Sequence, residues 1–187
     1  VEKLDQKDLL SKIDGICVTH EHGDHISGIP VILKKCKIPL FATYNTSEAA
    51  NYTFFKDNTS CSLDLPWNVI TECCEFELGD LKITPFTIPH DVSGPVAYVI
   101  DDGTHKLGIA TDMGVPTETA QLFLKDCDAL VLEFNHDLDM LLESDRCWDL
   151  KCRVKGDRGH LSNAQAQQLL SSIATDRLKS IFLAHIS

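Results

Sequence analysis

The stretch of sequence that decides the fold is Thr19-His20-Glu21-His22-Gly23-Asp24-His25, which follows the apolar run IDGICVT. Three imidazoles and a carboxylate fall within this short segment. Imidazole nitrogens and carboxylate oxygens are the usual protein ligands of zinc and similar divalent ions. In a turn after a strand, residues 20 and 22 can face one way and residues 24 and 25 another. The spacing therefore predicts two adjacent metal positions, the alternative being a polar loop that is rich in histidine by chance.

Three further candidate ligands each stand at the end of an apolar run. His90 follows LKITPFTIP, Asp112 follows KLGIAT and His185 follows SIFLA. Ligands of open α/β sheets bind where strands end, so we expect these side chains to meet the histidine-rich turn. Taken singly, each fits an ordinary strand-end residue, but together they complete two metal sites of plausible composition.

Composition and charge narrow the class of protein. The 187 residues include 43% hydrophobic and 24% charged residues, with 17 Lys and Arg against 28 Asp and Glu, a net charge of −11. These values are ordinary for a globular domain and exclude intrinsic disorder and coiled coil. No apolar run approaches the roughly 20 residues of a membrane span, so we expect no membrane partner and a cytoplasmic protein. The acidic balance argues against a general nucleic-acid coat protein.

The chain has eight cysteines, and none forms a CxxC pair. We expect them to be reduced, buried, small apolar residues, as is usual in the cytosol. A zinc–thiolate site is the alternative, but the spacings do not support it.

The chain alternates strand and helix patterns, with hairpins in its middle, which predicts one α/β domain over residues 1–187. We expect strands at 13–19, 37–43, 69–80, 81–89, 95–103, 106–111, 128–134 and 180–185. We expect helices at 4–12, 25–36, 45–56 (capped by Asn45), 117–126, 137–143 and 164–174 (capped by Ser162 or Asn163). Loops are expected at 57–67 and 144–158.

The segment THEHGDH matches the THxHxDH signature of the metallo-β-lactamase fold superfamily, and the chain resembles that superfamily over nearly its whole length. The resemblance implies a four-layer αβ/βα sandwich with two divalent metal ions, zinc being expected and manganese the alternative. It implies that one ion is held by His20, His22 and His90 and the other by Asp24, His25 and His185, with Asp112 bridging them. A metal-activated hydroxide would be the nucleophile, oriented by Asp24.

Later motifs are similar to the nucleic-acid-processing branch of this superfamily. Glu133 in LVLEFNHD, the segment GHLSN at 159–163 and the segment LAHIS follow the order seen in tRNase Z-like enzymes, and look closest to the YycJ-like (WalJ) exonucleases. The resemblance implies that Glu133 and His160 assist catalysis, with His160 protonating the leaving oxygen. The alternatives are a solvated strand-end charge and an ordinary loop residue.

Residues 144–158 carry five basic and three acidic residues in a chain that is otherwise acidic. Such a loop can contact phosphates, and its Trp148 can stack on a base; an ordinary solvated loop is the alternative. We expect substrate contacts from Arg153, Lys155, Arg158, His136 and Asn163.

We therefore predict a metal-dependent hydrolase that cleaves phosphodiester bonds of nucleic acid, in the manner of a DNA exonuclease. A glyoxalase II-like thioesterase or lactonase and a non-catalytic metal-binding domain are the alternatives. Superfamily members have strands before the histidine-rich turn, whereas Val1 stands almost directly at the first predicted helix, so we expect a partial domain that lacks the N-terminal strands. The sequence leaves the oligomeric state open.

Overall fold

The computed structural model describes residues 9–56 and 65–187, which fall into two compact units. The first unit comprises Val1–Cys74 and Val92–Pro95, and the second comprises Glu75–Asp91 and Val96–Ser187. Each unit has its own sheet and its own apolar core. The predicted α/β class is therefore confirmed in both units.

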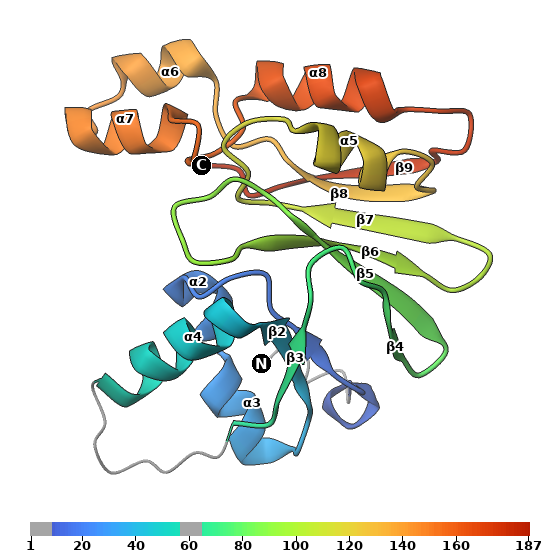
Figure 1. Cartoon of the computed structure of the whole chain (residues 1–187). Helices are drawn as coiled ribbons and strands as arrows, with labels where there is room; N and C mark the ends of the chain where they lie inside the picture. Colours follow the sequence, from blue (N-terminus) through green and yellow to red (C-terminus); the bar gives the residue numbers. More distant parts are fainter. Residues whose placement is uncertain (1–8, 57–64) are drawn as a thin grey trace. The chain divides into compact units, whose positions relative to one another are not determined.

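The first unit contains a parallel three-stranded sheet in the order β1-β2-β3 (Figure 1). Its elements are η1 (Leu10–Lys12), β1 (Ile16–Cys17), α2 (Gly23–Ile26), α3 (Ile29–Lys35), β2 (Leu40–Thr43), α4 (Tyr44–Lys56) and β3 (Trp67–Ile70). Its buried core joins Val18, Ile26, Ile29, Leu40, Ala42 and Ala50. The chain is therefore packed into the core on both sides of the histidine-rich turn. Val18 lies just before the turn and Ile26 just after it.

The second unit contains a six-stranded mixed sheet in the order β4-β5-β6-β7-β8-β9. Its strands are β4 (Phe76–Leu78), β5 (Leu81–Thr87), β6 (Val96–Asp101), β7 (Lys106–Ala110), β8 (Ala129–Glu133) and β9 (Ser180–Ala184). The pairs from β4 to β7 are antiparallel, and β7-β8 and β8-β9 are parallel. Because β5, β7, β8 and β9 end at the same edge, the residues that follow them are brought together there.

Four helices accompany this sheet: α5 (Glu118–Leu124), α6 (Leu138–Glu143), α7 (Trp148–Lys155) and α8 (Asn163–Ile173). Helices α5 and α8 lie along the sheet, and α6 and α7 form a pair beyond the ends of the strands (Figure 1). Thr117 caps α5 through the Ala120 N–H, and Ser162 caps α8 in a capping box with Gln165. The predicted caps of α8 therefore include the correct residue, Ser162.

Several predicted boundaries are wrong. The strand predicted at 69–80 is two strands in different sheets, since a turn at Thr71–Cys74, with Cys73 at φ 60°, separates β3 from β4. The helix predicted at 25–36 breaks between Ile26 and Ile29, where Pro30 fits the first turn of a new helix.

Other expectations also need correction. Helix α4 begins at Tyr44, so Asn45 lies inside it rather than capping it. The loop predicted at 144–158 contains helix α7. Of the helix predicted at 4–12, residues 10–12 form a 3₁₀ turn, and residues 1–8 lie outside the described residues, as do residues 57–64 of the predicted loop.

The seven described cysteines are free thiols, as predicted, but most are not buried. Only Cys127 is fully buried, whereas Cys73, Cys74 and Cys147 are exposed. Cys61 lies outside the described residues. Within the described part of the chain, no helix has both the length and the apolar character that a membrane crossing requires.

Candidate metal centre

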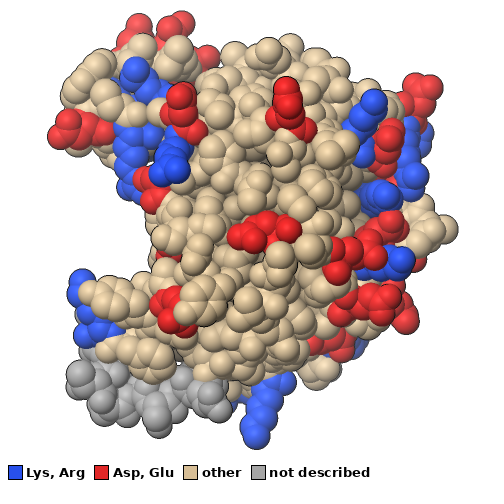
Figure 2. All heavy atoms as spheres, in the orientation of Figure 1, with Lys and Arg blue, Asp and Glu red and all other residues tan. Residues whose placement is uncertain are grey.

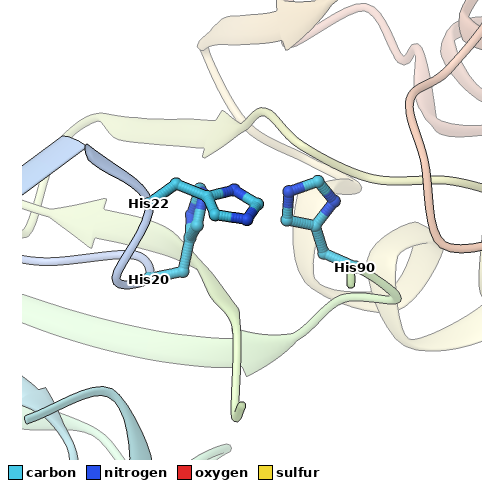
Figure 3. A group of neighbouring side chains, drawn as sticks. All are labelled: His20, His22 and His90. Carbon is cyan, nitrogen blue, oxygen red and sulfur yellow. The ribbon is translucent and has the colours of Figure 1, made fainter. Parts of the chain in front are cut away.

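The histidine-rich turn of the first unit links the end of β1 to helix α2, whose N-cap is His22. The ring of His20 lies edge-on to that of His22, with centroids 4.8 Å apart, and 4.0 Å from that of His25 (Figure 3 shows His20 and His22). Asp24 stands at the first turn of α2, with Oδ2 3.6 Å from Nε2 of His25. The predicted ligands of this segment are therefore gathered on one turn.

Two nitrogens of this turn already converge. Nε2 of His20 lies 3.0 Å from Nδ1 of His22. Nitrogens bound to one tetrahedral zinc at 2.0–2.1 Å lie roughly 3.3 Å apart, so this spacing fits two ligands of a single ion. Thr19 supports the arrangement, because its Oγ1 lies 3.1 Å from Nδ1 of both His20 and His25. A partner at Nδ1 leaves Nε2 of each ring to act as a ligand.

The second unit holds a cluster of candidate ligands at the end of its sheet where its strands finish. His90 follows β5 (Figure 3), Asp112 follows β7 and His185 follows β9. Oδ1 of Asp112 lies 3.1 Å from Nε2 of His185 and 3.9 Å from Nε2 of His90. The three strand-end residues predicted from the sequence are thus neighbours.

The ring of His90 is oriented by the backbone. Its Nδ1 donates a hydrogen bond to the carbonyl oxygen of Gly159 over 3.1 Å. This bond places the lone pair of the neutral ring on Nε2, the nitrogen that faces Asp91 and Asp112. Burial lowers the pKa of His90, and Asp112 and Asp91 oppose that shift. A neutral imidazole is the form that binds a metal ion.

Two of these residues have a left-handed backbone. Asp112 has φ 61° and His185 has φ 54°, a region that residues other than glycine rarely adopt. Such conformations cost about 1–3 kcal/mol each and cluster at functional sites, where the surrounding structure holds them. Here Asn135 helps to hold His185, because its Nδ2 donates to the His185 carbonyl oxygen over 2.8 Å.

Glu133 is the buried anchor of the cluster. Its side chain is fully buried, Oε1 lies 2.8 Å from Nδ1 of His160, and Oε2 accepts the backbone N–H groups of Met113 (3.0 Å) and Leu161 (3.1 Å). The carboxylate therefore fixes both the residue after Asp112 and the residue after His160. Both oxygens of this buried carboxylate therefore have hydrogen-bond partners, which a buried polar group requires.

His160 lies between the ligands and this anchor. Its ring is 5.2 Å from that of His90 and is stacked on that of His185 at 5.1 Å. Burial alone would lower the pKa of His160, but the hydrogen bond and the charge of Glu133, with Asp112, outweigh it and raise the pKa. The ring is thus held in an environment that favours a proton.

The chemistry of this cluster fits a divalent ion. Asp112, Glu133, His160 and His185 offer ligand atoms that lie within 4.8 Å of one another, and of these four the sequence predicts Asp112 and His185 as ligands, with Glu133 and His160 paired beside them. Mixed nitrogen and oxygen donors of this kind suit zinc and manganese alike. The cluster therefore supports binding of a divalent metal without identifying it.

Residues predicted to bind substrate have other contacts in the structure. Arg153 of α7 donates from Nε to Oδ2 of Asp91 over 2.6 Å, and Lys155 lies over the ring of Trp148 at 5.9 Å. Arg158 is exposed. Figure 2 shows that blue and red side chains alternate where α6 and α7 lie, so this region is mixed in charge rather than purely basic.

The two remaining residues predicted to bind substrate, His136 and Asn163, are joined to each other. The Asn163 N–H donates to the His136 carbonyl oxygen over 2.8 Å, and an isolated bridge pairs His136 with Ser162.

The sequence analysis missed three supporting residues. Thr19 opens the signature segment, and Asn135 stands inside LEFNHD, so both lay within motifs already noted. Asp91 directly follows His90, and its contacts with Arg153 and with the His90 ring reveal its supporting role. Their roles rest on contacts that the sequence motifs do not contain.

Comparison with known proteins finds relatives that match most of the chain. The chain is 31% identical over 178 residues to a protein named exodeoxyribonuclease YycJ from Bacillus anthracis, covering 95% of this chain and 66% of that protein. The chain thus spans slightly less than two-thirds of the length of that relative.

Solved structures share the fold. The metallo-β-lactamase fold protein YhfI of Bacillus subtilis aligns with a TM-score of 0.71 at 18% identity, covering 99% of this chain and 69% of that one. The short form of human tRNase Z aligns with a TM-score of 0.69 at 17% identity, covering 100% and 77%. The predicted metallo-β-lactamase fold and the likeness to YycJ are therefore confirmed. Since the family described as "Beta-lactamase superfamily domain" matches residues 2–186, the chain belongs to the β-lactamase superfamily.

Proposed function

We propose that this chain carries the metal centre of a phosphodiesterase that acts on nucleic acid, in the manner of a DNA exonuclease. The observation that carries the proposal is the contact between Glu133 and His160 beside Asp112 and His185. A thioesterase needs metal ligands but has no need of a buried carboxylate–imidazole pair next to them. The name of the 31% identical relative, an exodeoxyribonuclease, points the same way.

The proposed ligands are those that the signature predicts. His20, His22 and His90 would hold one ion and Asp24, His25 and His185 the other, with Asp112 shared. We expect zinc, with manganese as the alternative. When bound, two such ions polarise a phosphoryl oxygen and supply hydroxide at neutral pH.

The side chains of the protein have separate tasks. His160 holds a proton on the ring that faces the cluster and would transfer it to the leaving oxygen of the cleaved ester. Glu133 fixes the ring through Nδ1, so that Nε2 presents the proton. Asp24 would orient the attacking hydroxide.

The test measures metal content and product together. Mass spectrometry of the metal-replete protein should find about two divalent ions per chain. Release of nucleotides from DNA, lost on addition of a chelator, supports the proposal. Release of thiol from thioesters alone would show the glyoxalase II-like activity instead, and bound metal without either product would show a non-catalytic domain.

Variants separate ligands from the proton donor. His22→Ala and Asp112→Ala should lose metal and activity together. His160→Ala should keep a folded protein and lower kcat by about 10²- to 10⁴-fold, the usual contribution of a general acid. His105→Ala is the matched control, because His105 is exposed in the β6–β7 turn and contacts Asp102; it should change neither quantity.

A further inference from the structure

A cavity of about 350 Å³ lies in the second unit beside helix α6. Its walls come from the segment after β8, from α6 and the loop that follows it, from the start of α8 and from the segment after β9. Cavities of a few hundred Å³ with a few placed polar groups are the usual form of small-molecule sites. The volume suits a ligand the size of one nucleotide.

The cavity shares its walls with the metal-binding cluster of this unit. Asn135 lines it, and the Nδ2 of this residue donates to the carbonyl oxygen of His185. Asn163 also lines it, only three residues after His160. A group bound in the cavity therefore lies one side chain away from the segments that present His160 and His185.

Two buried polar residues, Asn135 and His136, line this space. His136 lines the cavity and is only 7% exposed, and its Nδ1 lies 3.2 Å from Oδ1 of Asn135. Among the described residues, its ring has no other hydrogen-bond partner. Nε2 is thus available to a ligand, and Asn163 adds an amide that can donate and accept.

The lining of the cavity also combines charge with apolar surface. Arg146 lines it, with Nη2 3.1 Å from Oγ of Ser187, and a guanidinium is well suited to a phosphate. Met140 and Ile186 line it and are 72% and 71% exposed, which leaves apolar surface that a base can cover. Asp137 is also present, but its Oδ1 accepts the Met140 N–H at the start of α6.

We infer that this cavity holds one unpaired nucleotide of the substrate strand, next to the phosphodiester to be cleaved. The base lies on Met140 and Ile186, its polar edge meets His136 and Asn163, and its phosphate meets Arg146. A base pair does not fit the volume, so the site selects single strands and frayed ends, where bases are free to leave the stack. This inference rests on the proposed function, because it names the substrate of that centre.

The test is direct binding of 2′-deoxyadenosine 5′-monophosphate to the metal-depleted full chain, measured by calorimetry. We expect His136→Ala and Met140→Asp each to raise the Kd at least about fivefold, since the first removes a hydrogen-bond partner and the second places a negative charge beside the base and its phosphate. Met140→Asp should fold normally even if His136→Ala does not, because Met140 is exposed and lies outside the hydrogen-bond network around Asn135. Leu122→Asp, at an equally exposed site on α5, is the matched control and should leave the Kd unchanged.

A second measurement tests strand selectivity. A single-stranded oligonucleotide should displace the mononucleotide at least about tenfold better than a blunt duplex of the same sequence. Equal Kd values for wild type and both cavity variants, or equal displacement by the duplex, would overturn the inference. If the protein cleaves DNA but the cavity variants bind the mononucleotide with the wild-type Kd, the cavity is not the nucleotide site and the proposed function stands. If the mononucleotide binds as expected but no phosphodiester is cleaved, the proposed function is wrong and the binding site stands.

Discussion

Arg153 and Asp91 form a charged hydrogen bond of 2.6 Å between helix α7 and the residue that follows His90. The contact raises the pKa of Arg153 through its hydrogen bond to Asp91 and through the charge of Asp91. Oδ1 of the same carboxylate lies 3.5 Å from Nε2 of His90. Arg153, which the sequence predicts to bind substrate, therefore also positions Asp91 beside His90, a predicted metal ligand.

This relationship predicts the effect of Arg153→Ala. Partners of metal-ligand side chains change metal affinity about 10- to 100-fold when they are removed. We expect the variant to weaken metal binding by about tenfold, measured by competition with a chelating dye. Lys155→Ala, on the same helix but over Trp148, should not. A variant with wild-type metal affinity and only a raised KM would restore Arg153 to a substrate-binding role.

Removal of the Glu133 carboxylate should lower the stability of the fold as well as the activity. Glu133→Ala leaves the Met113 and Leu161 N–H groups and the His160 ring without their buried acceptor. Each stranded buried group costs about 1–3 kcal/mol, so we expect the free energy of unfolding to fall by about 3 kcal/mol or more in urea denaturation. Glu133→Gln keeps the volume and one acceptor oxygen, so it should lose less stability while still lowering kcat. Equal stability of Glu133→Ala and wild type would contradict the anchoring role.

The sequence could predict where the candidate metal ligands lie, because they form a contiguous motif or stand at strand ends. The turn from His20 to His25 is a contiguous motif, and His90, Asp112 and His185 each end an apolar run. Parallel and antiparallel pairing then brings the last three to one sheet edge, which requires no further side-chain detail. Glu133, the last residue of β8, is predicted in a different way, from the resemblance to tRNase Z-like enzymes.

Helix α7 escaped prediction for physical reasons. Half of its eight residues, WDLKCRVK, are charged, and its N-cap, Cys147, makes no side-chain cap hydrogen bond. The helix is fixed instead by tertiary contacts, with Lys151 Nζ donating to the Leu142 carbonyl oxygen at the end of α6 over 2.7 Å. Contacts of this kind depend on the folded chain and leave no periodic signal.

The backbone at the end of α7 leaves no room for a side chain at Gly159. A Cβ on Gly159 would collide with the carbonyl oxygens of Arg153 and Val154, and backbone cannot turn aside as a side chain can. We expect Gly159→Ala to lower the free energy of unfolding by about 1–3 kcal/mol. It should also weaken metal binding, since the Gly159 carbonyl oxygen orients His90. Gly23→Ala meets no atom within 4 Å and is the control for stability; a larger loss there would contradict the argument.

The contact between Asp128 and Arg177 should make the stability of the fold depend on pH. The hydrogen bond from Arg177, then that from the Lys106 N–H, lowers the pKa of Asp128 in the folded protein. A carboxyl with a lowered pKa stabilises the fold above its unfolded pKa, about 3.9, and loses that effect as the pH falls through the folded value. Arg177→Gln should therefore lower Tm by a few degrees at pH 7 and by less at pH 3. A difference that grows toward low pH would contradict the assignment.

Cysteine chemistry offers a test of the fold that is independent of metal. Burial raises the pKa of Cys17 and of Cys127 to about 11 in each case, so neither forms a thiolate at pH 8. Cys73, Cys74 and Cys147 are exposed. We expect iodoacetamide to label the exposed three within minutes in the native protein, and Cys17 and Cys127 only after denaturation, as read by peptide mass spectrometry. Rapid native labelling of Cys127 would show that the core between β7 and α5 opens, because that thiol packs in the cluster that contains Leu124 and Leu130.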